Sequence, residues 1–165
     1  MRGFAVAYGA STIVNAMATG RGGAFGVNTY VRAEVELLED PHKFEVYIEN
    51  DPTENPKLAV ESVKIVMERA GVRMGAKVRT NSNIPVARGL KSSSAASNAI
   101  IMATASALGV KLTPIEVAKL SALANLRAGT SLTGAFDDAC ASVLGNVCLT
   151  DNTRMCIIRR YPLNE

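Results

Sequence analysis

Hydrophobic and polar residues alternate along two segments within the first fifty residues of the chain. In residues 30–37 and 44–49 every second side chain is apolar, and the intervening ones are charged or are tyrosines. A period of two predicts strands with one buried and one solvated face. The short connection between them contains Pro41, so we predict that the two strands pair as a hairpin. The apolar positions expected to face the core are Val31, Ala33, Val35, Leu37, Phe44, Val46 and Ile48.

A helix is predicted between Asn55 and Gly71. Asn55 is a favoured N-cap residue, Pro56 suits the first helical position, and Gly71 stands where a helix commonly ends. The apolar residues between them recur at helical spacing, so we expect one face of this helix to be buried. These residues are Ala59, Val63, Val66, Met67 and Ala70.

The second half of the chain is predicted to be mainly helical. Residues 93–108 are rich in Ala and Ser and are followed by Gly109. The sequence Thr-Pro-Ile-Glu at residues 113–116 is a capping box that begins a helix through about residue 126. A third helix is expected at residues 137–144. Further strands are expected at residues 2–8, 76–82, 146–149 and 155–160.

This order of elements predicts an α+β fold, a two-layer sandwich with helices over one face of a sheet. Residues 1–165 contain no linker-like tract or repeat, so we expect one domain. Hydrophobic residues make up 48% and no apolar run reaches the roughly 18 residues that span a membrane. Without a signal-peptide pattern, a cytoplasmic location is expected. The net charge of +3 is scattered, which argues against a nucleic-acid-binding face.

The cysteines and the single histidine offer little chemistry. Cys140, Cys148 and Cys156 lack the close pairing of zinc ligands, so we expect buried, apolar thiols. His42 follows Pro41 in a turn-like segment and is expected to be solvated. A Ser-His-Asp triad would have to use this residue, and the sequence contains no Gly-x-Ser-x-Gly nucleophile elbow.

The most informative segment is Pro-Val-Ala-Arg-Gly-Leu-Lys-Ser-Ser-Ser-Ala-Ala at residues 85–96. Gly89 permits a backbone turn, and the three serines lead directly into a predicted helix. The free N–H groups of a helix N-terminus form a natural site for a phosphate, and Lys91 adds a positive charge. Serine capping of an exposed helix explains one of these serines but not three. The Walker A spacing is absent.

This segment resembles the central motif of the GHMP kinases, which usually reads PxxxGLGSSAA. Lys91 and the additional serine are similar to the archaeal-type shikimate kinase branch of that family. Two further blocks carry the same resemblance, at residues 10–26 and 128–142. The resemblance implies the ribosomal-protein-S5-like fold of GHMP N-terminal domains. It also implies ATP-dependent phosphorylation of the 3-hydroxyl of shikimate, in aromatic amino-acid biosynthesis, with ATP and Mg²⁺ as cofactors.

The resemblance also implies roles for individual residues. Asp137 is the expected catalytic base, with Asp138 as the substitute, although a first-turn acid also stabilises a helix. Ser93 is the expected hydroxyl near Mg²⁺. The expected ATP-binding residues are Pro85, Val86, Ala87, Arg88, Gly89, Leu90, Lys91, Ser92, Ser93, Ser94 and Ala95. The expected substrate contacts are Ser11, Asn15 and Arg21, with a tight glycine-rich connection as the alternative.

The chain departs from the family pattern in two respects. No acidic residue occurs in residues 117–136, where many GHMP kinases carry a magnesium-binding Glu, and Glu116 belongs to the capping box. The family's C-terminal domain is also not expected within residues 1–165. We therefore expect this part alone to bind nucleotide weakly and to fail at turnover. A homoserine or mevalonate kinase, or a non-catalytic nucleotide-binding or RNA-binding domain, remains an alternative.

Overall fold

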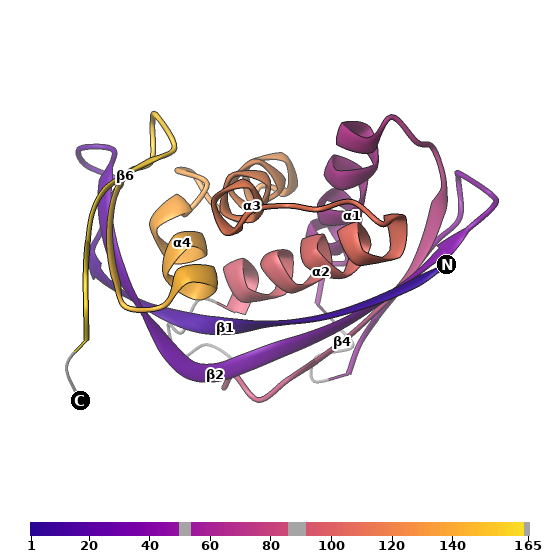
Figure 1. Ribbon diagram of the computed structural model, residues 1–165, viewed down its shortest axis with the longest axis horizontal. Helices are drawn as coiled ribbons and strands as arrows, with labels where there is room; N and C mark the ends of the chain where they lie inside the picture. The colour runs from indigo at the N-terminus through magenta and orange to yellow at the C-terminus, as the bar shows by residue number, and fades with distance from the viewer. Residues whose placement is uncertain (50–53, 86–91, 164–165) are drawn as a thin grey trace.

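The computed structural model describes residues 1–49, 54–85 and 92–163. These residues form a curved, six-stranded sheet with helices over its concave face (Figure 1). The predicted α+β class and the single helix-covered face are therefore confirmed. The strands are β1 (Arg2–Val14), β2 (Arg21–Leu38), β3 (Phe44–Ile48), β4 (Gly75–Ser82), β5 (Val147–Asp151) and β6 (Cys156–Tyr161). The helices are α1 (Lys57–Ala70), α2 (Ser92–Leu108), α3 (Pro114–Ala128) and α4 (Phe136–Leu144).

The long strand β2 organises the sheet. β1 runs antiparallel along one of its edges, while β4 and β5 pair with different parts of its other edge. β4 takes residues 31–38 and β5 takes residues 21–25, so the two strands follow one another along β2. β3 and β6 extend the sheet beyond β4 and β5.

The predicted hairpin between residues 30–38 and 44–49 is wrong. β4 lies between β2 and β3, and β3 pairs with β4 in parallel. Parallel neighbours need a crossover connection, which α1 supplies between β3 and β4. The alternation correctly predicts strands, and the core-facing positions of β2 are buried. The alternation does not indicate which strand is the partner, because side chains alternate with a period of two in both parallel and antiparallel strands.

The glycine-rich residues 10–26 are mostly strand rather than a tight connection. β1 continues to Val14 and β2 begins at Arg21, which leaves a turn of six residues between them. Glycine in β1 also allows a helix to lie close to the sheet. A Cβ at Gly3 would lie 2.0 Å from the carbonyl oxygen of Ala103 in α2, so only glycine allows this contact.

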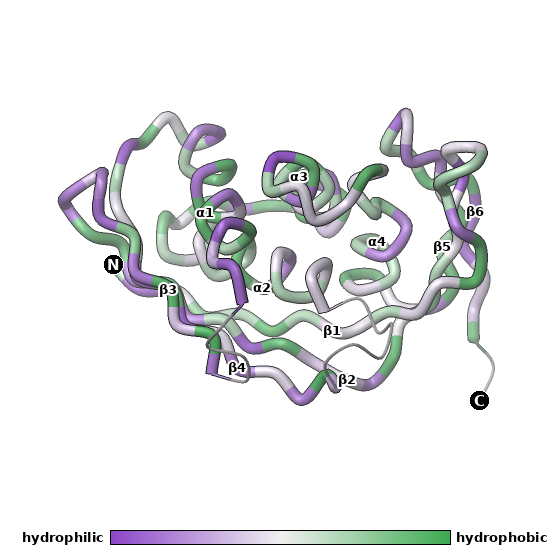
Figure 2. The backbone as a smooth tube through the Cα atoms, turned by 180° about the vertical axis from the view of Figure 1, so that it is seen from behind, coloured by the Kyte–Doolittle hydropathy of each residue, from purple (hydrophilic) through white to green (hydrophobic). Residues whose placement is uncertain are grey.

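The helices form a layer in which α2 and α4 contact the sheet directly. α2 packs on β1 and β2, and α4 packs on β1, β2 and β5 (Figure 1). α3 packs against both of these helices, and α1 packs against α2 and α3. The predicted stripe of α1 packs inward, with Ala59, Val63 and Met67 buried among residues of β2, β4 and α2. In Figure 2 hydrophilic and hydrophobic residues alternate along β2 and β4, as a strand with one solvated face requires.

The predicted helix boundaries are close to the observed ones. α1 begins one residue later than predicted, with Pro56 rather than Asn55 at the N-cap position, and the side chain of Asn55 accepts a hydrogen bond from the backbone of Lys57 at 2.9 Å. Gly71 ends α1 in the left-handed conformation. Thr113 and Glu116 form the expected capping box of α3. No helix in the described residues is long and apolar enough to cross a membrane.

Candidate active site

The first turn of α2 begins with Ser92, Ser93 and Ser94. Pro85 precedes this turn in the chain, three residues after the end of β4. The predicted ATP contacts Val86, Ala87, Arg88, Gly89, Leu90 and Lys91 lie outside the described residues. The described serines place the N-terminal N–H groups of a 17-residue helix near the end of β4, where they can bind an anion.

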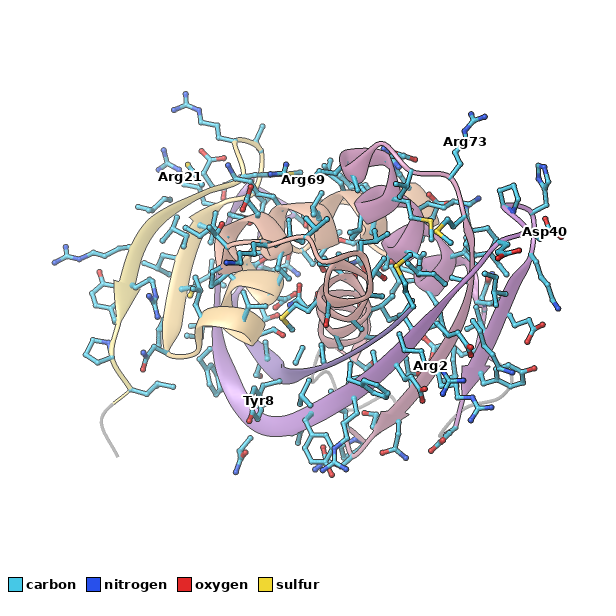
Figure 3. All side chains as sticks on the ribbon, turned by 45° about the vertical axis from the view of Figure 1, so that its right-hand side comes forward. Arg2, Tyr8, Arg21, Asp40, Arg69 and Arg73 are labelled. Carbon is cyan, nitrogen blue, oxygen red and sulfur yellow. The ribbon has the colours of Figure 1, made fainter. Side chains whose placement is uncertain are left out.

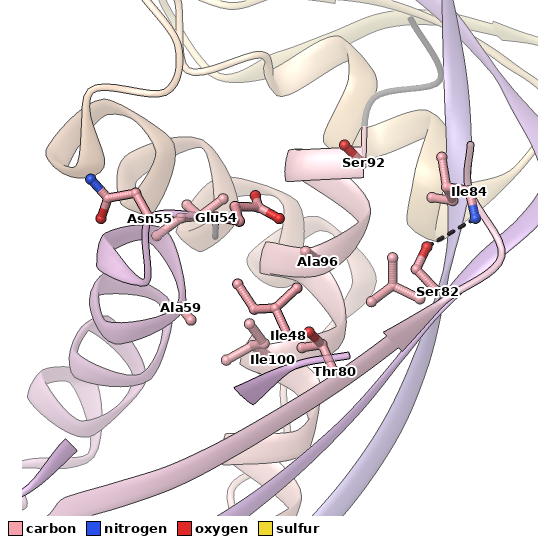
Figure 4. A pocket seen from close by; sticks show the side chains of 12 residues that line it. Ile48, Glu54, Asn55, Ala59, Thr80, Ser82, Ile84, Ser92, Ala96 and Ile100 are labelled. Carbon is pink, nitrogen blue, oxygen red and sulfur yellow. Dashed lines mark hydrogen bonds between the residues drawn. The ribbon is translucent and has the colours of Figure 1, made fainter. Parts of the chain in front are cut away.

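One side of α2 borders a pocket of about 310 Å³ (Figure 4). Ser92, Ala96 and Ile100 recur at intervals of four and line it from the helix. The opposite wall comes from the ends of β3 and β4, and the start of α1 completes it with Asn55 and Leu58. The lining of the whole pocket is mostly apolar, although Glu54, Thr80 and Ser82 also border it. Such a lining suits a flat, weakly polar ring system beside the helix N-terminus.

Another side of α2 faces α4. The buried amide of Asn98 donates a hydrogen bond to the carbonyl oxygen of Ala139 at 3.1 Å, which joins the two helices. Ser94 lies one turn earlier on α2 and is also buried. Its Oγ atom has no hydrogen-bond partner among the described residues. A buried hydroxyl in this condition is costly unless water or a ligand satisfies it, so this side of α2 is suited to a polar ligand.

Asp137 and Asp138 occupy the first turn of α4, where a negative charge is favoured by the helix dipole. Both side chains are buried, with exposed fractions of 3% and 2%. Asp138 accepts a hydrogen bond from the Thr12 hydroxyl at 3.2 Å, and Asp137 accepts one from the Asn152 amide at 2.8 Å. The turn before them is tight, with Ala135 in the left-handed region at φ 51°.

The two carboxylates border a second pocket, of about 230 Å³. The turn after β1 contributes Asn15, and residues 130–133 contribute a wall with three hydroxyl side chains beside Leu132. The structure therefore brings the predicted Asn15 close to Asp137 and Asp138, although Asn15 precedes them by more than 120 positions in the sequence. The sequence-based reasoning missed Thr12 and the hydroxyl side chains of that wall, which are Thr130, Ser131 and Thr133.

Ser11 and Arg21 are not among the residues that line this pocket. Thr12 reaches α4 on the inner face of the sheet, so Ser11 lies on the outer face, because neighbouring strand residues point to opposite sides. Arg21 is exposed beside Asp151 of β5 (Figure 3), and its neighbour Gly22 is the residue that faces the Asp137 carboxylate. Tyr8 likewise points outward from β1 in Figure 3.

Comparison with known proteins identifies the family of this chain. The family model described as "GHMP kinases N terminal domain" matches residues 57–146, which is more than half of the chain. The chain belongs to the GHMP kinase family. The match extends from α1 to the end of α4 and therefore includes both Asp137 and the start of α2.

Curated relatives narrow the comparison within this family. A shikimate kinase from Methanosarcina acetivorans is 47% identical over 96% of this chain and 54% of its own length. One from Pyrococcus furiosus is 43% identical over 100% of this chain and 60% of its own length. The chain thus spans about half the length of the curated relatives it matches.

Solved structures share the fold at low sequence identity. The mevalonate kinase of Methanococcus jannaschii superposes with a TM-score of 0.77 at 13% identity, over 100% of this chain and 56% of its own. The homoserine kinase of Cytophaga hutchinsonii gives 0.75 at 17% identity, over 90% and 48% of the two chains. At these identities the likeness concerns the fold alone.

The side chain of Glu116 is engaged in the capping box of α3. It accepts hydrogen bonds from the backbone and side chain of Thr113 and pairs with Arg69 of α1. The Thr113 backbone N–H is the main reason why the pKa of Glu116 is lowered. Within the described part of the chain, His, Cys, Asp and Glu side chains form no group of three that could hold a metal.

The cysteines lie in different environments. Cys140 and Cys148 are buried as expected, and burial raises the pKa of both thiols. Cys156 at the start of β6 is exposed, so the expectation of a buried thiol is wrong there. It lies in an outer strand of the sheet, and its side chain does not face the helices. His42 is exposed, as predicted.

Proposed function

We propose that the protein containing this chain transfers the γ-phosphate of ATP to the 3-hydroxyl of shikimate. The observation that carries this proposal is a pair of pockets, one lined by the first turns of α2 and the other by the first turn of α4, which packs against α2. One is largely apolar and the other is polar with two buried carboxylates. The names of the curated relatives, shikimate kinases at 38–47% identity across the chain, support the choice of acceptor. A cytoplasmic location is expected for such a biosynthetic enzyme.

In this proposal ATP lies along the first turn of α2. Residues 85–95 surround its phosphates, and the N–H groups at the start of α2 bind their oxygens. The adenine ring enters the pocket lined by Ile48, Leu58 and Ile100. Because the other side of α2 is joined to α4 through Asn98, the γ-phosphate can extend toward the carboxylates of α4.

Shikimate occupies the second pocket, where Asn15 and the hydroxyls of residues 130–133 can bind its hydroxyl groups. Asp137 accepts the proton of the 3-hydroxyl as that oxygen bonds to the γ-phosphorus. The bond between the γ-phosphorus and the bridging oxygen breaks, and ADP leaves. Asp138 already receives a hydrogen bond from Thr12, so we assign it to holding the pocket wall rather than to proton transfer.

The oxygen donors near α2 are compatible with Mg²⁺, which binds oxygen ligands and usually keeps several waters and substrate phosphates in its coordination sphere. Ser93 in the first turn of α2 is the residue that we propose near the metal. The unpartnered Oγ of buried Ser94 fits a site completed by a ligand or its water. When bound, Mg²⁺ would neutralise phosphate charge as the reaction proceeds.

The test is a coupled kinase assay on the full-length protein with shikimate, homoserine and mevalonate as acceptors. With ATP present, we expect turnover of shikimate and no turnover of homoserine or mevalonate. Asp137→Asn keeps the shape of the side chain but cannot accept the proton, so kcat should fall by about 10² to 10⁴-fold. Asp151→Asn is the matched control, because Asp151 lies in β5 away from the pocket lining. Turnover of homoserine or mevalonate instead would refute the assignment of shikimate.

A further inference from the structure

A buried chain of hydrogen bonds connects the sheet to Asp137. The Thr150 hydroxyl of β5 donates to Oδ1 of Asn152 at 2.7 Å, and Nδ2 of Asn152 donates to Oδ1 of Asp137 at 2.8 Å. The exposed fractions of Thr150, Asn152 and Asp137 are 0%, 4% and 3%. A hydrogen bond from an uncharged donor to a buried carboxylate is among the stronger polar interactions in proteins.

The backbone holds Asn152 in place independently of its side chain. Its N–H donates to the carbonyl oxygen of Gly20 at 2.7 Å, and the preceding residue Asp151 pairs with Arg21 at the start of β2. Asn152 therefore sits where two neighbouring strands meet the turn after β1. From this position its amide reaches across to the first turn of α4 and links the two layers of the domain.

The chemistry of the three groups determines how the amide is turned. A carboxylate only accepts hydrogen bonds, so the amide must present its NH₂ group to Asp137. Its carbonyl oxygen then faces Thr150, whose hydroxyl can donate to it. The opposite orientation would place two acceptor oxygens against each other. The Thr150 hydroxyl thus supports the orientation that Asp137 requires.

The two oxygens of Asp137 consequently differ. Oδ1 is bound by Asn152, whereas no hydrogen bond from a described residue reaches Oδ2. Oδ2 lies beside Gly22, only 2.5 Å from the position that a Cβ atom of that residue would take. The missing side chain at position 22 leaves room for this oxygen next to the second pocket.

We infer that Asn152 is a positioning residue, which acts through Asp137 and is itself held in place by a hydrogen bond from Thr150. This inference rests on the proposed function. By binding Oδ1, Asn152 stops rotation of the carboxylate and keeps Oδ2 available for the proton of the acceptor hydroxyl. A proton acceptor displaced by about 1 Å can cost about 10²-fold in rate. Partners that orient a functional side chain in this way often change activity by about 10 to 100-fold.

The experiment compares kcat and KM of full-length variants with shikimate and ATP. Asn152→Ala should lower kcat by about 10 to 100-fold and leave KM for ATP within about twofold. Thr150→Val removes the hydroxyl at nearly constant volume and should lower kcat by a smaller factor, and Thr150→Ser should restore most of that loss. Thr104→Val is the control, because Thr104 is equally buried but bonds only to the Ile100 carbonyl of its own helix.

Thermal unfolding is measured on every variant. A structural role alone would lower the melting temperatures of Thr150→Val and Thr104→Val and leave kcat at the assay temperature unchanged for both, which would overturn the inference. Equal kcat for Thr150→Ser and Thr150→Val would overturn the role of the hydroxyl. If the wild-type protein phosphorylates a different alcohol, the substrate assignment fails and the same comparison on that alcohol still decides the role of Asn152. A wild-type protein without any phosphotransfer would overturn both proposals.

Discussion

Gly22 gives the most direct test of whether the Asp137 carboxylate must stay where the structure has it. The substitution Gly22→Ala introduces one methyl group on the inner face of β2. Its carbon atom would lie 2.5 Å from Oδ2 and 2.7 Å from Cγ of Asp137. Gly22 has no positive φ angle, so the backbone accepts alanine and the clash with the carboxylate is the main perturbation.

The size of the effect follows from these distances. Carbon and oxygen in ordinary contact are separated by about 3.4 Å, so the carboxylate must move by roughly 1 Å. A displacement of that size is expected to lower kcat by about 10²-fold, which corresponds to about 2.7 kcal/mol in the activation free energy. The extra methyl group should also cost about 1–3 kcal/mol of stability, because it overpacks a buried contact.

The assay is steady-state kinetics with shikimate, combined with direct measurement of Mg·ATP binding by calorimetry. ATP affinity should stay within about twofold, since the α2 side of the site is unchanged. Gly23→Ala is the matched control. A Cβ at position 23 meets Cδ2 of Leu149 at 2.7 Å, and this end of a flexible side chain can rotate away. If folded Gly22→Ala keeps more than about a third of the wild-type kcat, Asp137 does not need its observed position and the proposed mechanism is wrong.

Two further predictions concern the accessibility of the cysteine thiols and the stability of helix α3. A thiol reagent at pH 8 should label Cys156 in the native protein but reach Cys140 and Cys148 only after unfolding, because burial shields both thiols and their raised pKa keeps them protonated. Rapid native labelling of more than one thiol, counted by mass spectrometry, would contradict this. Thr113→Ala should lower the free energy of unfolding by about 1 kcal/mol in urea titrations, with kcat unchanged, because it removes the N-cap of α3.

Local sequence patterns were sufficient to locate most helices and strands. The capping box at Thr113, the stop at Gly71 and the alternation in residues 30–38 act through neighbours in the chain, and each corresponds to an observed element. The partner of β3 was not predictable in the same way. Its pairing with β4 depends on the crossover through α1, which joins residues some thirty positions apart.

Some residues of the candidate site could likewise be predicted from the sequence, and others could not. The serines at the start of α2 and the acidic pair Asp137 and Asp138 are visible in the sequence, because phosphate sites and helix first turns have recognisable residue types. Asn152 and Gly22 carry no such pattern. An asparagine after a strand and a glycine within one are common, and their meaning arises only where β5, β2 and α4 meet around one carboxylate.

By itself, then, the sequence determined the fold class and the family and led to the prediction of a phosphate-binding turn, since these depend on residue type and short-range spacing. The tertiary structure decided which strands are neighbours, which of the candidate residues share a pocket, and which oxygen of Asp137 is left unbound. Those properties depend on distances between segments that lie far apart in the sequence, such as Thr12 and Asp138, which are separated by 126 positions. Packing of the helices on the sheet sets these distances, and no local pattern records them.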